Sequence, residues 1–355
     1  MLCLLTPPSC LSVQNSVTIN LQNTRVPIMR LPEPSRREFL RFCAAGAAYA
    51  AAGGSGVALA EGVVKSKVVV ARDAGLRGAG RTPDSGRVLA LLDRAVQACY
   101  GGDNALDAWK KMVRPGETVG LKVNTLAGRG GSTGPVLVEA LCERLQQAGI
   151  REENIIVWDR EESDLESGGY RNRHKMRCVG NDTAGYEDQL AVFGSVGSRL
   201  SRTVTRTCDA IINLPVLKDH GITGMTVALK SFYGAIHNPN KYHPNCGDPY
   251  IADVNMLEPL RRKLRLHICD GLTAQYEGGP SFMPQWQWAY NGLLVSRDPV
   301  ALDYTAWQIV ERKRAEKSMK PLAAEGREPR YLATAADARH RLGTNDPRLI
   351  ERVEV

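Results

Sequence analysis

The feature that most constrains the fold is a regular alternation of short apolar runs with longer segments of helical periodicity. The runs at 67–71, 117–124 and 154–158 have the length and composition of buried strands. Between them, apolar residues recur every three or four positions over 88–99 and 135–148, which predicts two amphipathic helices. A strand–helix–strand–helix–strand order predicts a parallel sheet with right-handed crossovers. The expected fold class is therefore α/β, a mainly parallel sheet flanked by helices in Rossmann-like layers.

The rest of the chain extends this pattern. Apolar runs at 210–213, 265–270 and 293–297 predict further strands. With 355 residues, of which 43% are hydrophobic, the chain is long enough for one large α/β domain, expected at 61–355, or for two lobes that share a cleft. The segment 161–200 is polar and glycine-rich with weak periodicity, which predicts a loop or lid over the strand ends.

Residues 1–60 have the three parts of a twin-arginine signal peptide in the right order. Ser35-Arg-Arg-Glu-Phe-Leu40 supplies the paired arginines, an alanine-rich run of weak hydrophobicity follows at 42–59, and small residues end the segment at Ala58-Leu-Ala60. We therefore expect export by the twin-arginine translocation machinery to the periplasm or another extracytoplasmic space, with cleavage near Ala60. An uncleaved anchor is the alternative, and Met29 offers a second possible start.

The charge of the remaining chain argues against nucleic acid as a partner. Removal of the leader takes away five arginines and two glutamates, which leaves 41 basic and 36 acidic residues and a net charge of +5. These charges form no block of like sign, so nucleic-acid binding is not expected. Six cysteines remain and none lies in a C-x-x-C pair, so the chain is expected to have no iron–sulfur module of its own.

Residues that carry chemistry concentrate in the segment 214–237. Lys218 and His220 follow a buried apolar run, and Lys230 lies ten residues after the histidine. Gly224 between them allows the backbone to turn tightly or to approach a ligand, and apolar residues at helical spacing follow it. A strand end, a glycine turn, a helix start and lysines together favour an anion site. The alternative is an ordinary strand–loop–helix joint with solvated lysines.

Polar residues also follow several other predicted strands. In an open parallel sheet, ligands bind beyond the carboxyl ends of the strands. The residues expected to bind a small anionic ligand are Lys122, Asn124, Arg160, Lys218, Gly224 and Asp303. The candidate catalytic residues are His220, Lys230 and Asp270. Asp303 lies on the buried stripe of a predicted helix, where a carboxylate needs a partner, so a structural ion pair is an equal alternative for it.

A polar loop near the centre of the chain contains potential metal ligands. His237, His243 and Cys246 have the spacing H-x5-H-x2-C, and Cys269 or Asp270 is a candidate fourth ligand. Imidazole and thiolate groups of this kind bind transition metals. The spacing matches no standard zinc finger, so an ordinary polar loop is the alternative interpretation.

Several of these motifs, taken as a set, resemble the domain-of-unknown-function family 362 over residues 65–355. The motifs that carry the resemblance are Lys122-Val-Asn124, Lys218-Asp-His220, Thr223-Gly224, Lys230, Asp270-Gly271, Gly278-Gly-Pro280 and Ser296-Arg-Asp-Pro-Val-Ala-Leu-Asp303. The resemblance implies an α/β domain, and members of the family often carry a twin-arginine signal or an attached iron–sulfur module.

A more distant resemblance suggests a chemistry. His220, Gly224 and Lys230 reproduce the spacing of a histidine, a glycine and a lysine in the nickel-pincer lactate racemase family. The resemblance implies that Lys230 anchors a metal-organic cofactor and that His220 is an acid/base or a metal ligand.

These observations lead to two hypotheses of function. The first is an exported enzyme, of oxidoreductase or racemase/isomerase type, that acts on a small anionic substrate with a metal or redox cofactor and a redox partner. The second is a periplasmic protein that binds a small anion or a cofactor without turnover. Lysines suffice for binding, whereas catalysis also requires that His220 faces the ligand.

Overall fold

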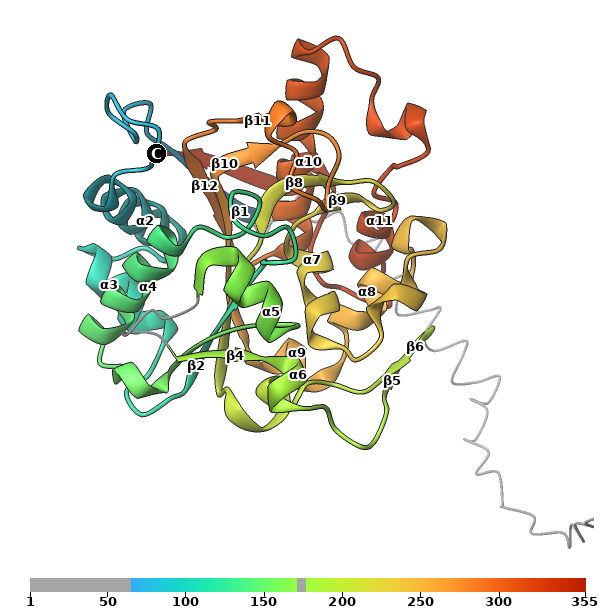
Figure 1. Cartoon of the computed structure of the whole chain (residues 1–355), viewed down its shortest axis with the longest axis horizontal. Coiled ribbons are helices and arrows are strands. Elements are labelled where there is room, and N and C mark those ends of the chain that lie inside the picture. The colour runs from blue at the N-terminus through green and yellow to red at the C-terminus, as the bar shows by residue number, and fades with distance from the viewer. Residues whose placement is uncertain (1–64, 171–176) are drawn as a thin grey trace, which may run out of the picture. The chain divides into compact units, whose positions relative to one another are not determined.

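A mixed β-sheet forms the centre of the protein. The computed structural model describes residues 65–170 and 177–355, and the predicted leader and its cleavage site lie outside the described residues (Figure 1). The main path of the sheet runs in the order β13 (Ile350–Glu354), β1 (Ser66–Arg72), β12 (Gly292–Ser296), β10 (Leu264–Gln275), β7 (Ala210–Leu214), β2 (Val119–Val123), β3 (Ile155–Asp159) and β4 (Arg177–Gly180).

Most neighbouring strands are parallel, which confirms the expected α/β class. β2 pairs in parallel with both β3 and β7, and β10 pairs in parallel with β7. The exception on the main path is β12, which is antiparallel to both β1 and β10. The chain between β10 and β12 contains no α-helix among its described residues. An antiparallel neighbour needs no helical crossover, so this short connection explains the reversed strand.

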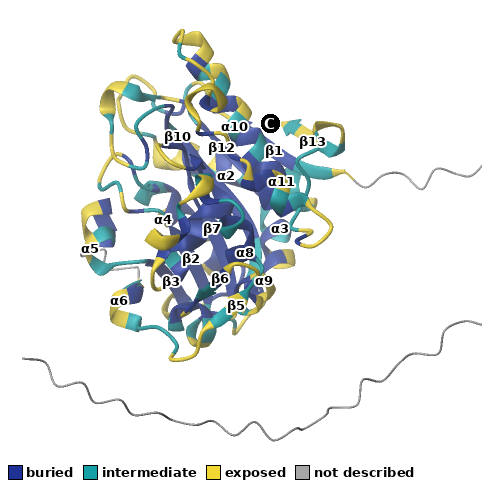
Figure 2. Ribbon diagram, turned by 90° about the vertical axis from the view of Figure 1, so that its right-hand side faces the viewer, coloured by how far each residue is buried: buried dark blue, intermediate teal, exposed yellow. Residues whose placement is uncertain are grey.

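Helices cover both faces of the sheet. One face packs against α2 (Ser85–Tyr100), α3 (Ala105–Met112) and α4 (Pro135–Gln147), and the other lies under α7 (Ala228–Ser231), α8 (Tyr250–Asn255), α9 (Glu258–Lys263), α10 (Pro299–Glu316) and α11 (Tyr331–Ala336) (Figure 1). In β1, successive side chains point to opposite faces of the sheet and are buried on both. Val69 and Ala71 join the core on the α2 side, whereas Val68 and Val70 join the core under α10. Figure 2 shows the strands as the buried middle layer.

Two segments differ from the sequence-based expectation. The segment 161–200, predicted as a loop or lid, contains the sheet-edge strand β4 and a small hairpin of β5 (Ala191–Phe193) and β6 (Val196–Ser198). The helix predicted after Gly224 is shorter than expected. β9 (Gly224–Thr226) pairs with β8 (Val216–His220) as an antiparallel hairpin. The backbone N–H and C=O groups of β9 bond to β8, so they are not available for helical hydrogen bonds.

The predicted inward stripe of that segment is nevertheless buried. Met225, Leu229, Phe232 and Ile236 are all fully buried, although they lie on a strand, a short helix and a 3₁₀ turn. The stretch 250–263 forms two short helices, α8 and α9, rather than one continuous helix. Pro259 occupies the first turn of α9, where its missing N–H is tolerated.

All described residues belong to one compact unit, spanning Gly62–Val355, built on a common sheet rather than on two lobes. The six cysteines of this part are free thiols. Among the described residues, none of the helices combines the length and the apolar character that a membrane span requires.

Gly224 is required by both its backbone and its surroundings. Its φ is +80°, and a Cβ added there would lie 2.2 Å from the carbonyl oxygen of Arg327. Gly326 is a matched comparison, because its φ is +72° and an added Cβ would meet nothing within 4 Å.

We expect Gly224→Ala to destabilise the fold much more than Gly326→Ala. The control should lose only the roughly 1–2 kcal/mol of a left-handed alanine. Gly224→Ala adds a backbone collision in the hairpin that carries His220. Urea unfolding of both variants measures the difference, and equal losses would show that the collision relaxes without cost.

Candidate functional site

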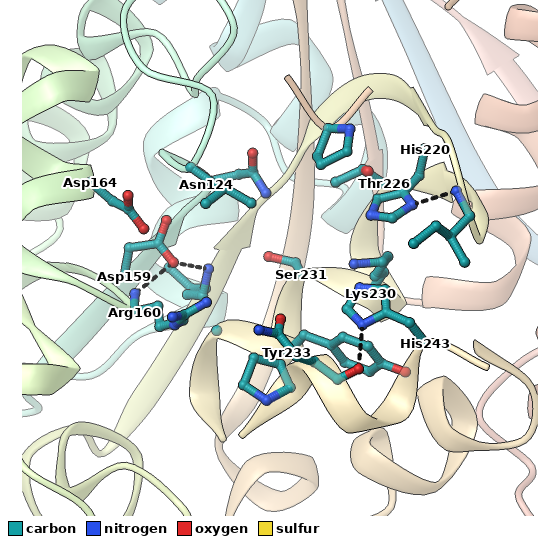
Figure 3. Close-up of a pocket in the computed structure, with 17 residues that line it drawn as sticks. Asn124, Asp159, Arg160, Asp164, His220, Thr226, Lys230, Ser231, Tyr233 and His243 are labelled. Atoms are coloured by element: carbon teal, nitrogen blue, oxygen red, sulfur yellow. Dashed lines mark hydrogen bonds and ion pairs between the residues drawn. The ribbon is translucent and has the colours of Figure 1, made fainter. Parts of the chain in front are cut away.

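A cavity of about 400 Å³ opens at the carboxyl ends of β2, β3 and β8. Its lining includes Lys122 and Asn124 from the end of β2, Arg160 after β3, His220 at the end of β8, and Lys230 on α7 (Figure 3). Lys122, Asn124, Arg160 and His220 were predicted as site residues from the strand-end pattern. Lys230 was predicted from the segment 214–237. Lys218 and Asp270, which the strand-end pattern also predicted, are not part of the lining.

The floor of the cavity contains a buried ion pair. Lys122 Nζ lies 2.7 Å from Asp159 Oδ1, and both side chains are almost fully buried. The second carboxylate oxygen of Asp159 accepts hydrogen bonds from the backbone N–H and the hydroxyl of Thr125, each at 2.7 Å. Gly234 lies directly over this pair, since a Cβ there would come within 3.0 Å of both Lys122 and Asp159. Lys122 is thus neutralised by the protein itself.

Lys230 is different, because its amine has no acidic partner. Its side chain is 8% exposed, and its Nζ lies 4.7 Å from the ring centroid of Tyr233. Among the described residues, no oxygen accepts a hydrogen bond or forms an ion pair with this amine. Burial, with the charges of Lys218 and Lys122 as the next causes, lowers the pKa of Lys230 to about 7. The amine is therefore partly neutral near neutral pH and faces the cavity.

Two histidines flank Lys230 with opposite arrangements of their ring nitrogens. His220 Nδ1 accepts hydrogen bonds from the backbone N–H groups of Ile222 and Thr223, at 3.1 and 3.2 Å, so the proton of the neutral ring is on Nε2. His243 Nδ1 lies 3.2 Å from the carbonyl oxygen of Asn240 and must donate to it, which leaves Nε2 as an acceptor. The rings stack with centroids 5.6 Å apart.

Burial lowers the pKa of His220 strongly, and the charges of Lys230 and His243 add to the effect. The pKa of His243 is lowered by the same causes, burial first and Lys230 next. Both rings are therefore neutral at pH 7, one presenting an N–H donor and the other a lone pair.

Other polar atoms at the cavity lack partners. The Ser231 hydroxyl belongs to a residue that is 4% exposed and makes no hydrogen bond within the described chain. The same holds for the side-chain carbonyl oxygen of Asn124. Buried polar groups are normally hydrogen-bonded, so unpaired atoms beside a cavity point to a missing ligand or to water.

One acidic lining residue was not found from the sequence. Asp164 lies on α5 (Glu162–Leu165), within the segment predicted as a lid. Burial raises its pKa to about 6, with the charge of Asp159 as the second cause. No motif marked this residue, because it reaches the cavity only through the path that the chain takes after β3.

Three predicted site residues do not line the cavity but hold the loops around it. Lys218 Nζ donates to the carbonyl oxygens of Gly131 and Pro280, at 3.0 and 3.2 Å, and so joins two loops. Burial lowers the pKa of Lys218 to about 8. Asp270 accepts the backbone N–H of Gly134 at 2.7 Å, at the start of α4.

Asp303 of α10 acts on the helix that carries Lys230. Its two carboxylate oxygens accept the backbone N–H groups of Ala228 and Leu229, at 2.6 and 3.2 Å, and so cap the start of α7. Burial raises the pKa of Asp303 to about 8. The sequence suggested either an ion pair or an anion-binding role for Asp303. Its observed partners are instead two backbone N–H groups. Asp303 is a positioning residue.

The structure does not gather the predicted metal ligands. His237 is exposed and its ring packs against Tyr186, His243 stacks on His220, and Cys246 donates to the carbonyl oxygen of Gly326. Within the described residues, no group of three or more His, Cys, Asp or Glu side chains is placed to hold a metal ion. Gly224 likewise serves the hairpin turn and is not part of the cavity lining.

The fold and this cavity define an α/β protein with an open pocket at the carboxyl edge of its sheet, lined by two buried lysines and two histidines. A family described as Domain of unknown function (DUF362) matches residues 119–308, more than half of the chain, and every residue that lines the cavity lies within this range. The chain belongs to this family.

Two further proteins are similar to this chain. A thylakoid-associated protein of Synechocystis sp. is 27% identical over 242 residues, which cover 64% of this chain and 71% of that protein. A crystal structure of a protein from Thermotoga maritima aligns with a TM-score of 0.39 and 10% identity, over 66% of this chain and 60% of that protein, less than two thirds of its length.

We expect Asp159→Asn to destabilise the protein by roughly 3–5 kcal/mol, because the change leaves the buried ammonium of Lys122 without its carboxylate partner. Asp346→Asn is the control, since it breaks the ion pair with Arg348, whose side chain is 87% exposed, and should change stability little. Chemical denaturation at pH 7 compares the two variants. A loss at Asp159 no larger than that of the control would show that Lys122 gives up its proton or reaches water.

Proposed function

We propose that the protein is an enzyme that binds a small anionic substrate in this cavity and transfers protons on it. The observation that carries the proposal is the amine of Lys230, which is buried, faces the cavity, has no acidic partner, and lies beside two neutral histidines of opposite tautomer. A structural lysine would be paired, as Lys122 is.

The lining suits an anion of small size. A protonated Lys230 gains its missing counter-charge from the ligand. Arg160, which pairs with Glu161 through one of its nitrogens, adds a second cationic group to the lining (Figure 3). The Ser231 hydroxyl and the Asn124 carbonyl oxygen are available to a ligand that both accepts and donates hydrogen bonds. A cavity of about 400 Å³ is within the range of small-molecule sites.

The two histidines supply the proton transfer in this proposal. His220 presents Nε2–H and donates a hydrogen bond to the substrate oxygen on which negative charge develops, whereas His243 presents the lone pair of Nε2 and acts as the base that accepts the proton. The lowered pKa values of His220 and His243 keep both rings neutral near pH 7. The N–H donor of His220 and the lone pair of His243 are therefore both available at this pH. A binding protein without turnover would need Lys230 but not this complementary pair.

The wider proposal retains a metal or redox cofactor and export. If a metal-organic cofactor of the kind implied by the racemase resemblance is bound, Lys230 is the residue that would hold it. The twin-arginine motif at Arg36-Arg37 supports delivery to an extracytoplasmic space.

Anion affinity should fall as pH rises through about 7. The amine of Lys230 binds an anion when protonated, and its pKa near 7 means that the charge is present below this pH and lost above it. Inorganic sulfate, titrated calorimetrically, should therefore bind about tenfold more weakly for each pH unit above 7. Below pH 6 the affinity should rise further only through protonation of Asp164, whose pKa is about 6.

Two variants separate this effect from general charge screening. Lys230→Arg keeps its charge to high pH and should bind sulfate with little change between pH 6 and 9. Lys230→Met should bind poorly at every pH. A wild-type affinity that is independent of pH, or equal to that of Lys230→Met, would contradict the assignment of this amine as the anion ligand.

Export should depend on the paired arginines. Replacement of both Arg36 and Arg37 by lysine should retain the protein in the cytoplasm with its leader attached, as measured by fractionation and by the mass of the chain. Arg30→Lys, which lies outside the motif and is present with either start, is the matched control. Export of the double variant at the rate of the control would rule out the twin-arginine route.

A further inference from the structure

We propose that Lys230 is a nucleophile that forms a reversible imine with the carbonyl carbon of a small anionic aldehyde or 2-oxo acid. This substrate class rests on the cavity being the substrate site, as proposed above. It makes Lys230 a covalent catalytic residue, not only a counter-charge.

A comparison of the three buried lysines at this edge of the sheet singles out Lys230. Lys122 donates to the carboxylate of Asp159 and to the carbonyl oxygen of Val123, at 2.7 and 2.6 Å. Lys218 donates to two backbone carbonyl oxygens. These contacts stabilise the ammonium form of each, in which no lone pair is available. Within the described residues, Lys230 has neither kind of contact, so its amine is free to lose its proton and attack a carbon atom.

The surroundings of Lys230 also favour the neutral amine. Burial lowers the pKa of the Lys230 amine, and the positive charges of Lys218 and Lys122 lower it further. An amine activated in this way is characteristic of lysines that attack carbonyl groups. Asp303 fixes the start of α7 through two backbone N–H groups, which holds the attacking side chain in position.

The neighbouring side chains can complete the reaction. The lone pair of Nζ attacks the carbonyl carbon while His220 Nε2–H donates a hydrogen bond to the carbonyl oxygen. His243 Nε2 takes one of the two amine protons and passes it to that oxygen, which gives a neutral carbinolamine. The same nitrogen of His243 then takes the second amine proton and passes it to the hydroxyl, which leaves as water as the C=N bond forms, so both histidines end neutral. Amine and carbonyl compound thus give imine and water without an oxidant or a reductant. The opposite tautomers of the two rings match these two roles, a hydrogen-bond donor at His220 and a proton carrier at His243.

The anionic part of the substrate is assigned to the far side of the cavity. Figure 3 shows Arg160 on the opposite side of the view from Lys230, with Ser231 between them, and Asn124 also lines the cavity. A carboxylate directed toward Arg160 leaves a carbonyl group of the same small molecule directed toward Lys230. A simple monoanion without a carbonyl group would bind but would form no adduct.

Reductive trapping tests the proposal. The purified protein is incubated with glyoxylate or pyruvate and then with sodium borohydride, and the adduct is located by peptide mass spectrometry. We expect one reduced adduct, on Lys230, formed at least tenfold faster than on any other lysine. The internal control is Lys241, whose amine also lies against a tyrosine ring, at 4.8 Å, but which is exposed to solvent.

Variants make the outcomes distinct. Lys230→Arg should keep sulfate binding and lose the adduct, and His243→Gln should form the adduct more slowly while sulfate still binds. Labelling spread evenly over exposed lysines, or equal in Lys230→Arg, would overturn the imine. If sulfate binds with the expected pH dependence and no adduct forms, only the imine proposal fails. If neither sulfate nor the carbonyl compounds bind, the proposed function fails with it.

Discussion

The site depends on one electrostatic constraint, which is that three lysines are buried at the same edge of a sheet with a single carboxylate paired to them. A buried ammonium needs an opposite charge or several acceptors, because removal from water strongly disfavours the charged form. Asp159 satisfies Lys122, and two backbone carbonyl groups satisfy Lys218. Among the described residues, Lys230 has neither a carboxylate nor a carbonyl partner. The charge of its amine therefore depends on the ligand that the cavity holds.

Much of the remaining polar chemistry serves to hold that arrangement in place. Asp270 fixes the loop before α4, and Asp303 fixes the start of α7. The β8–β9 hairpin that carries His220 is tied down by a second buried network, in which Arg327 bonds Asp219 of the hairpin at 3.0 Å and Glu277 at 2.7 Å. Rotamers locked by such contacts are what a preorganised site requires, since small displacements weaken both binding and proton transfer. Charged residues near a site are therefore often supports rather than participants.

The same distinction explains where sequence reasoning succeeded and where it did not. Strand ends were predictable, because buried apolar runs are visible in the sequence and parallel strands present their carboxyl ends at one edge. Lys122, Arg160 and His220, which follow such runs, all line the same cavity. Asp164 was missed, since no local pattern marks it. The predicted metal ligands His237, His243 and Cys246 do not lie together. His237 packs against Tyr186, and Cys246 donates a hydrogen bond to Gly326.

The sequence by itself determined the layered α/β architecture and the set of basic and imidazole groups at one edge of the sheet. Local periodicity and strand length carry that information, since they follow from burial along each element. Only the tertiary structure decided which lysine is unpaired, which nitrogen of each histidine holds the proton, and that His243 stacks on His220. Those properties depend on hydrogen-bond partners contributed by segments far apart in the chain, and no local pattern specifies which segment will supply them.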